Sequence, residues 1–534
     1  MQSFNDRHGD PPFAPIRHLL ASAGLRIREK LSDLKAALNM PVYWGCCPNH
    51  HAGPAWIFMP YTPHRLCCGL AGLISVKRAQ APNDLQAVAT FDKTIETIRT
   101  HALKACLDRD AAIAGQYLGG DQLLETIYDQ TCLLKQEAPF LHLFTREGQQ
   151  AQLKALCEQL NDLIEHEVRA LQNQIGYLSA ADAEIIDRRI EKIKDIAWCL
   201  KVELLDNISK TKGLMGDGDF ARSVEAVKIF RNLNTVLNSI DRLEVRGRDS
   251  AGISLLFLFE QNDFASIEKA LSNAGLSEQI ESRSAKETLG NLSISIGQHT
   301  EAGLKGITLT YKVAAEIGSL GDNVRKLREA IAADPVLHLV ARQPNSYHTI
   351  SAHTRWASVG AITIANCHPV DNATCGAKSG SKGMIHACLN GDIDNYLSLK
   401  QQWEQIGGAI PEEITTDTKI IPLQIEYYLR QGHPIEEAFR LAVSDFEGSH
   451  AIAMHTDLAP GKFFLAQRGS GQAVFVGLAR DHYLPTSEVY GFVEQTSDYI
   501  RLNGEKVVEG ANGPTQGQIF ILDQNRSDRA LDAV

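Results

Sequence analysis

The spacing of apolar residues predicts a long helical block between about residues 84 and 243. Within it, apolar side chains recur every three or four positions, which places them on one face of an α-helix. The first series consists of Leu153, Leu156, Leu160, Leu163, Val168, Leu171 and Ile175, and the second of Ile186, Ile190, Ile193, Ala197, Leu200 and Leu204. We therefore expect this part of the chain to be all-α.

Residues typical of helix ends and turns mark the boundaries of these helices. Residues 176–178 separate the two series, so we expect an antiparallel helical hairpin with its turn there. Ser179 and Asp182 fit an N-cap residue followed three positions later by an acidic residue. Residues 217–219, Asp-Gly-Asp, interrupt the pattern before a further helix at about 221–243. We interpret this tripeptide as a turn, because the later ligands of a calcium loop do not follow it.

Outside this block, short apolar runs alternate with helical patterns. Residues 66–77 and 253–259 have the length and composition of buried strands. The other predicted strands are 307–311, 349–353, 384–389, 451–455, 463–467, 473–476 and 519–522. The other predicted helices are 16–38, 264–274, 323–332, 394–407 and 418–431. This order favours a mixed α/β layered fold over a doubly wound parallel one.

Composition narrows the class of protein. The 534 residues leave room for about two to four domains, and 44% hydrophobic with 22% charged residues is ordinary for a soluble globular protein. The formal net charge of −11 argues against a nucleic-acid-binding surface. No apolar stretch reaches the roughly 18 residues that span a bilayer. The 11 cysteines are scattered, which indicates free thiols in a reducing compartment. We therefore expect a cytoplasmic protein that binds neither nucleic acid nor a membrane.

The most informative short motif is Cys67-Cys68-Gly69, at the start of the strand predicted at 66–77. By itself, a cysteine there is well explained as a free thiol in the core. Four later segments change that interpretation, because together they contain the residue types of one hydrolytic site. They are Arg-Gly-Arg-Asp-Ser-Ala-Gly at 246–252, His-Thr-Arg-Trp-Ala-Ser at 353–358, Leu389-Asn390-Gly391 and Thr416-Asp417-Thr418.

In this order, the segments resemble the class II glutamine amidotransferases, a family of N-terminal-nucleophile hydrolases. The resemblance is closest to the glutaminase domain of glutamine–fructose-6-phosphate aminotransferase, the enzyme that makes glucosamine 6-phosphate. Asn366-Cys367-His368-Pro369 and Arg468-Gly469-Ser470 also follow in the order of that subfamily. Amidophosphoribosyltransferases share the overall plan but usually lack the His-Thr-Arg-Trp form, so they rank second. The implied fold is of the α+β class, an αββα sandwich, here with a large all-helical insertion and an N-terminal leader.

The resemblance implies a role for each motif. It implies that Cys68 is the nucleophile and forms a thioester with glutamine, after removal of a leader at 1–67 makes it the chain N-terminus. Its α-amine then accepts and returns the proton, since such an amine has a reference pKa of about 7.7–8.0. Asn390 and Gly391 are the implied oxyanion stabilisers. The implied glutamine-binding residues are Arg355 for the α-carboxylate, Asp417 for the α-ammonium, Trp356 and Ser358.

Each motif also has a plain structural interpretation. Asn390-Gly391 is a strong signal for a hairpin turn, and Asp417, after two threonines, fits a helix cap. An arginine beside a tryptophan at a strand end fits a surface cation–π pair. His368 fits a structural loop residue, and the Arg468–Ser470 region fits an ordinary turn. The residues by themselves leave these alternatives open.

The chain departs from the subfamily pattern at three positions. Val359 and Leu389 stand where histidines are usual, and both would line the glutamine pocket; Arg248 stands where a tyrosine is usual. The resemblance also sets the expected domains. These are a leader at 1–67, an amidotransferase domain at 68–80 plus 236–510, a helical insertion at 81–235, and a C-terminal strand with a polar tail at 511–534.

The motifs predict a glutaminase that releases ammonia from L-glutamine. No segment after about residue 510 resembles the sugar-isomerase lobes of the family. We therefore expect a separate sugar-phosphate isomerase or synthase subunit that passes the ammonia to fructose 6-phosphate. The sequence leaves open whether the chain forms a homo-oligomer. It also leaves open whether the chain is a non-catalytic relative that keeps its leader. We expect no cofactor and no metal: Cys46, Cys47, His50 and His51 are of metal-ligand types, but adjacent cysteines do not easily share a tetrahedral site.

Overall fold

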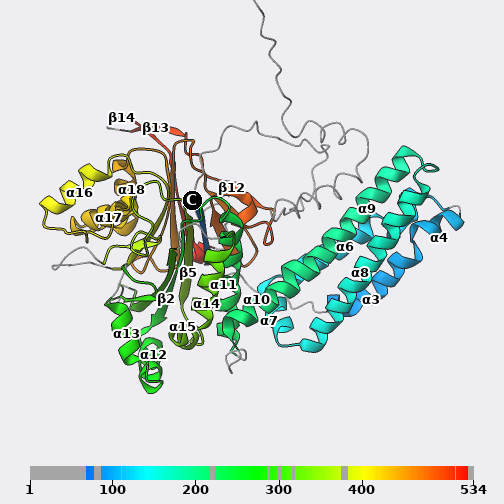
Figure 1. The fold of residues 1–534 in the computed structure, drawn as a ribbon, viewed down its shortest axis with the longest axis horizontal. Helices are drawn as coiled ribbons and strands as arrows, with labels where there is room; N and C mark the ends of the chain where they lie inside the picture. The colour runs from blue at the N-terminus through cyan, green and yellow to red at the C-terminus, as the bar shows by residue number, and fades with distance from the viewer. Residues whose placement is uncertain are drawn as a thin grey trace, which may run out of the picture. The chain divides into compact units, whose positions relative to one another are not determined.

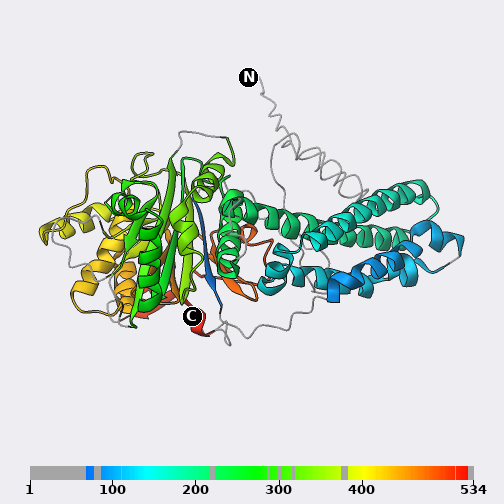
Figure 2. The same cartoon turned by 90° about the horizontal axis from the view of Figure 1, so that it is seen from below.

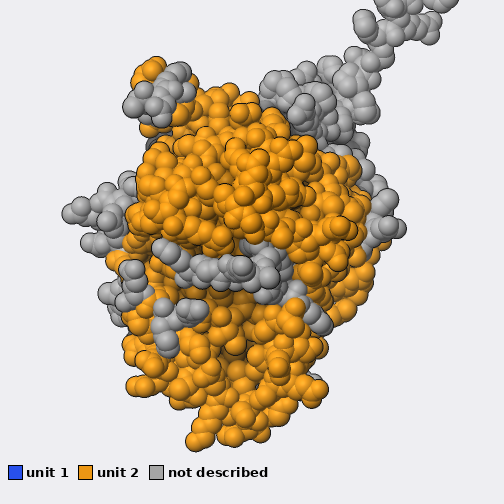
Figure 3. Space-filling model, turned by 90° about the vertical axis from the view of Figure 1, so that its left-hand side faces the viewer, with its two compact units in different colours: residues 1–44, 84–134, 148–203 blue, residues 45–83, 135–147, 204–534 orange. Residues whose placement is uncertain are grey.

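The computed structural model describes residues 68–76, 86–109, 111–216, 223–285, 289–297, 300, 302–314, 319–373, 383–510 and 513–526. The chain divides into two compact units, and Figure 3 shows a face of the second. The described residues of the first unit lie within 84–134 and 148–203, and those of the second within 68–76, 135–147 and 204–526. The functional domain boundaries given above stay a prediction.

The first unit is helical throughout its described residues. Its longest helices, α8 (Glu147–Gln174) and α9 (Ala180–Trp198), are the two expected from the apolar series, with the expected turn between them. At the start of α9, Ser179 Oγ accepts a hydrogen bond from the Asp182 N–H at 3.1 Å, which confirms the predicted cap. The remaining helical elements are α3 (Gln86–Thr100), α4 (Leu103–Asp108), α5 (Ile113–Gln116), the 3₁₀ turn Tyr117–Gly119, α6 (Asp121–Leu134) and the π-helical stretch Cys199–Leu205.

The second unit is built on two large antiparallel sheets. In the described part of this unit, one sheet has eight strands in the order β12-β10-β11-β1-β5-β2-β4-β3, and the other has five in the order β15-β9-β8-β7-β6. The eight strands are β1 (Gly69–Ser75), β2 (Ser250–Glu260), β3 (Ser293–Ile296), β4 (Leu304–Ala314), β5 (Tyr347–Arg355), β10 (Phe475–Leu478), β11 (His482–Thr486) and β12 (Tyr499–Arg501). The five are β6 (Val370–Asp371), β7 (Ile385–Gly391), β8 (His450–Thr456), β9 (Lys462–Arg468) and β15 (Gln518–Asp523), and β13 (Val507–Gly510) pairs separately with β14 (Gly513–Gln516).

The two sheets face each other, and helices cover their outer faces (Figures 1 and 2). On the five-stranded sheet the two sides of β7 separate cleanly, because side chains alternate along a strand. Leu389 packs in the core beneath α16–α18, whereas Cys388 packs with Leu70 of β1 between the sheets. α11 and α14 contact the strands of the other sheet. The helices of this unit are α7 (Glu137–Phe144), α10 (Asp206–Met215), α11 (Val224–Leu243), α12 (Gln261–Asn273), α13 (Ser277–Ser284), α14 (Asp322–Ala332), α15 (Pro335–Val340), α16 (Tyr396–Gln405), α17 (Ile420–Arg430) and α18 (Ile435–Asp445).

These layers confirm a mixed α and β fold with antiparallel sheets. The structure also contains elements that the sequence pattern does not predict: α13, α15, α18, β3, β6 and β11 to β14. Most of these elements are short, and a run of two to five residues has too few positions to show a period. The leader, the helix at 16–38, the cysteines and histidines at 46–51 and the turn at 217–219 lie outside the described residues. None of the helices in the described part of the chain is both long and apolar enough to cross a membrane.

Candidate active site

Cys68 lies immediately before β1, a strand in the interior of the eight-stranded sheet, between β11 and β5. Its side chain is buried and lies against the backbone of Trp356, 288 positions later in the sequence. The Trp356 N–H donates to Cys68 Sγ at 3.2 Å, and Sγ lies 3.4 Å from the Trp356 carbonyl oxygen. The antiparallel pairing of β1 with β5 therefore brings the cysteine motif to the His-Thr-Arg-Trp motif.

Gly69 has a steric reason to follow the cysteine. A Cβ atom at this position would lie 2.5 Å from Leu243 Cβ and 2.5 Å from Thr354 Oγ1, closer than side-chain atoms approach one another. Leu243 ends α11, and Thr354 is on β5. The glycine thus lets the residue after Cys68 fit between a helix and a neighbouring strand.

Asn390 reaches Cys68 from the opposite sheet. It is almost fully buried near the end of β7, and its Nδ2 donates to the Cys68 carbonyl oxygen at 2.8 Å. Gly391 follows with φ of 87°, and a Cβ there would collide with the Ser449 carbonyl. Gly391 pairs with His450 at the start of β8, so helices α16–α18 intervene between the two strands. The hairpin-turn interpretation of Asn390-Gly391 is therefore wrong.

The Arg-Gly-Arg-Asp-Ser-Ala-Gly segment packs against the His-Thr-Arg-Trp segment. Asp249 accepts from the Ala357 N–H at 2.7 Å through its carboxylate, and its own N–H donates to the Arg355 carbonyl at 3.1 Å. A Cβ atom on Gly247 would lie 2.6 Å from the Arg355 carbonyl carbon. The signature residues at 247 and 249 thus hold the backbone that positions Trp356 against Cys68.

Arg355 is buried, so the surface cation–π interpretation is wrong. Its guanidinium donates to the carbonyl of Ala361 at 3.2 Å and to the carbonyl of Val359. Trp356 is partly exposed, and Ser358 Oγ donates to Asp392 Oδ1 at 2.6 Å. The loop after β5 therefore folds back over Arg355 and contacts the segment after Gly391.

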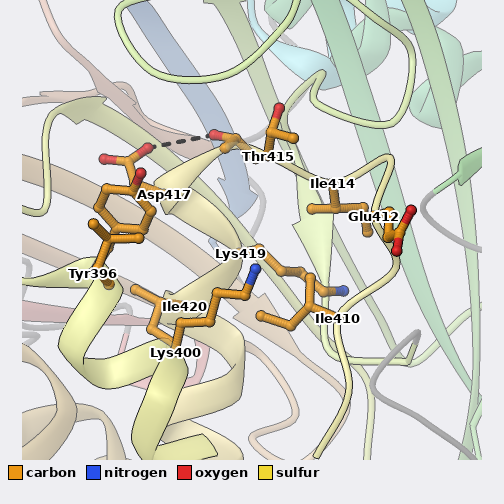
Figure 4. Close-up of a pocket in the computed structure, with 11 residues that line it drawn as sticks. Tyr396, Lys400, Ile410, Glu412, Ile414, Thr415, Asp417, Lys419 and Ile420 are labelled. Carbon is orange, nitrogen blue, oxygen red and sulfur yellow. Dashed lines mark hydrogen bonds between the residues drawn. The ribbon is translucent and has the colours of Figure 1, made fainter. Parts of the chain in front are cut away.

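Asp417 lies on the wall of a cavity of about 190 Å³ (Figure 4). Its Oδ2 accepts from the Ile393 N–H at 2.9 Å, and burial raises the pKa of its carboxyl to about 6. Thr416, not Asp417, is the N-cap of the 3₁₀ turn Asp417–Lys419, so the helix-cap interpretation is wrong. The cavity is lined by Tyr396, Leu397, Lys400, Ile410, Glu412, Ile414, Thr415, Thr416, Asp417, Lys419 and Ile420. The lining thus carries two carboxylates, Asp417 and Glu412, and two lysines, Lys400 and Lys419, among apolar side chains. Charges of both signs on a partly apolar wall suit a small polar ligand.

Two buried histidines lie between Asn390 and the threonines beside Asp417. His353 Nε2 is 2.9 Å from Asn390 Oδ1, and the ring of His353 packs on that of His368 with centroids 4.5 Å apart. His368 Nε2 is 2.8 Å from Thr418 Oγ1. Burial lowers the pKa of His353 to about 3 and also lowers that of His368, so both rings are neutral at pH 7. The sequence contains both residues in its motifs, but it carries no signal that they stack.

The structure thus gathers most of the expected site residues. Cys68 contacts Trp356 and Asn390 directly, whereas Asp417 connects through the backbone of Ile393. Leu389, at a position expected to line the glutamine pocket, instead packs in the core beneath α16–α18. Among the described residues, no group of three or more His, Cys, Asp or Glu side chains is placed to hold a metal ion.

No protein-family model matches this chain. Part of it is similar to curated proteins named glutamine–fructose-6-phosphate aminotransferase (isomerizing). The one from Methanothermobacter thermautotrophicus is 35% identical over 158 residues, which are 29% of this chain and 25% of that protein. Those from Streptomyces coelicolor and Bacillus subtilis are 33% identical over 159 residues and 31% identical over 156, in each case 29% of this chain and 24% of the relative. The match spans about a quarter of the length of these relatives and 29% of this chain.

Proposed function

We propose that this chain hydrolyses the side-chain amide of L-glutamine through Cys68 and delivers the ammonia to an acceptor. The observation that carries the proposal is the hydrogen bond from Asn390 to the backbone carbonyl of Cys68, which brings an amide donor to the cysteine residue across two sheets. A thiol nucleophile beside a fixed N–H donor is the minimum for amide hydrolysis through a covalent intermediate. The partial similarity to the aminotransferases supports the same assignment.

In the proposed reaction, the leader is removed and Cys68 becomes the chain N-terminus. Its α-amine takes the thiol proton, and the thiolate attacks the glutamine side-chain carbonyl to form a tetrahedral oxyanion. Collapse of this intermediate breaks the C–N bond, and the α-ammonium returns the proton to the departing ammonia. Water then attacks the thioester, which releases glutamate and restores the thiol.

The proposed oxyanion donors are the side-chain amide of Asn390 and the backbone N–H of Gly391. A side-chain NH₂ group has two hydrogens, and the carbonyl of Cys68 takes one of them. The other is left for the substrate oxygen. Removing one such donor typically lowers the rate by about 10²–10³-fold.

The amino-acid end of glutamine needs partners of both charges. We assign the α-ammonium to Asp417 and the α-carboxylate to Arg355, with Trp356 and Ser358 beside them. A guanidinium has five N–H donors. The carbonyls of Val359 and Ala361 are acceptors for two of its nitrogens, which leaves donors for a carboxylate.

We further propose that the acceptor is fructose 6-phosphate, bound by a separate isomerase-type subunit in amino-sugar synthesis. The names of the relatives motivate this substrate, and the site described here accounts only for the release of ammonia. Ammonia is mostly protonated in neutral water, so transfer needs a passage that excludes solvent.

Glutamate release from glutamine by the purified chain tests the hydrolytic step, with Cys68→Ala as the matched control. We expect wild type to release glutamate and Cys68→Ala to release none. Intact mass spectrometry of the same sample shows whether the active species begins at Cys68. Equal rates for wild type and Cys68→Ala would exclude Cys68 as the nucleophile.

A further inference from the structure

We infer that His353 is a positioning residue that orients the Asn390 side chain for oxyanion binding. The inference rests on the proposed function and concerns the same site. His353 does not touch Cys68 in any hydrogen bond of the described structure; it acts through Asn390, whose Oδ1 lies 2.9 Å from His353 Nε2.

The hydrogen bonds leave one orientation for the Asn390 amide. The carbonyl oxygen of Cys68 can only accept, so the atom of Asn390 that faces it at 2.8 Å must be the NH₂ nitrogen. The amide oxygen of Asn390 then faces His353. Since this oxygen also only accepts, His353 Nε2 must carry the hydrogen. A flipped amide would place two acceptors against each other at the Cys68 end.

This arrangement holds the amide plane at both ends. With Oδ1 held by His353 and one N–H held by the Cys68 carbonyl, the second N–H has a set direction beside the nucleophile. A donor that already points at the position of the oxyanion need not reorganise when negative charge develops there. Most of the catalytic effect of such a donor comes from this preorganisation. Without His353, the amide could rotate about its last side-chain bond and lose that direction.

The surroundings keep His353 in this tautomer and place. It is fully buried on β5, opposite Leu70 of β1 and Gly252 of β2. His368 packs on one side of its ring and is itself held by Thr418. No hydrogen bond of ordinary geometry reaches His353 Nδ1 among the described residues, although the Leu389 carbonyl lies near the ring. The hydrogen on Nε2 therefore follows from the contact with Asn390 Oδ1.

The test compares His353→Leu with His353→Gln in the full chain. Leucine removes the donor, whereas the glutamine side chain can place an N–H near the position of His353 Nε2. We expect His353→Leu to lower kcat for glutamate release about 10–100-fold with little change in KM, and His353→Gln to recover most of it. His338→Leu, at a buried histidine on α15 away from the site, controls for general loss of packing, and its kcat should stay at the wild-type level.

A double-mutant cycle with Asn390→Ala separates positioning from structure. If His353 acts through Asn390, His353→Leu lowers kcat little further once Asn390 is alanine. An equal drop in both backgrounds would overturn the inference.

Imidazole ¹⁵N NMR of the wild-type protein gives a readout without turnover, and the signals lost in His353→Gln identify the residue. A neutral ring protonated at Nε2 at pH 7 supports the inference. A ring protonated at Nδ1, or at both nitrogens, would refute it even if the leucine variant does not fold. If the wild-type protein has the expected tautomer but releases no glutamate, the proposed function is refuted, whereas the contact between His353 and Asn390 is not.

Discussion

Asn390 and Cys68 are 322 positions apart, yet Asn390 Nδ2 donates to the Cys68 carbonyl at 2.8 Å. The two residues lie on facing sheets, Cys68 just before β1 and Asn390 near the end of β7. The contact therefore depends on the packing of the sandwich and not on either motif alone. It also sets the first prediction.

Asn390→Ala should lower kcat for glutamate release about 10²–10³-fold, because it removes a donor aimed at the developing oxyanion. The thiol itself stays in place, so alkylation of Cys68 by iodoacetamide should proceed at the wild-type rate. Asn262→Ala, at an exposed asparagine of α12, is the control and should match wild type. Retention of full activity by Asn390→Ala would remove this residue from the mechanism.

Gly69→Ala should destabilise the fold, since the added methyl group has no room between Leu243 and Thr354. Overpacking of this kind typically lowers the free energy of unfolding by about 1–3 kcal/mol. Gly213→Ala in α10 is a matched control, because no atom outside the surrounding helix backbone lies within 4 Å of its added Cβ. Alanine there should raise stability by about 0.5–1 kcal/mol. Urea denaturation followed by circular dichroism measures both changes.

The KM for glutamine should rise as the pH falls below about 6, the value to which burial raises the pKa of Asp417. Above that pH the carboxylate is ionised and attracts the α-ammonium of the substrate; below it the carboxyl is neutral and does not. Asp417→Asn should have a high KM at every pH and lack this dependence. Steady-state kinetics between pH 5 and pH 8 provide the measurement, and a flat wild-type KM profile would contradict the assignment of Asp417 to the ammonium.

Asp457 should make the fold less stable as the pH rises from about 4 to about 7. Burial raises the pKa of its carboxyl to about 7, so the folded state holds a proton that the unfolded state has lost in this range. Stability falls with pH wherever the folded state binds more protons. Asp457→Asn should flatten the pH dependence of the unfolding free energy, whereas Asp498→Asn, at an exposed position, should not. Denaturation at pH 4.5 and pH 7.5 compares the variants.

Much of the secondary structure follows from the sequence, because helix and strand patterns depend on neighbours in the chain. The series from Leu153 to Leu171 lies on the buried face of α8, and Ser179 caps α9 as expected. β2 and β4 carry apolar residues along their lengths and extend beyond the predicted runs at both ends. Two-residue strands such as β6 leave no comparable pattern, since their pairing is decided by distant partners.

The sequence by itself determined the class of secondary structure and the chemical groups of the candidate site: a thiol, an amide, a guanidinium and a carboxylate. Only the tertiary structure decided which of these groups touch. It turned Asn390-Gly391 from an apparent hairpin turn into the end of β7 and placed Asn390 on Cys68. It also put His353 behind Asn390, sealed from water, where burial keeps the ring neutral. The physical reason is that sheet packing, hydrogen-bond direction and burial arise between residues far apart in the chain, where local periodicity carries no information.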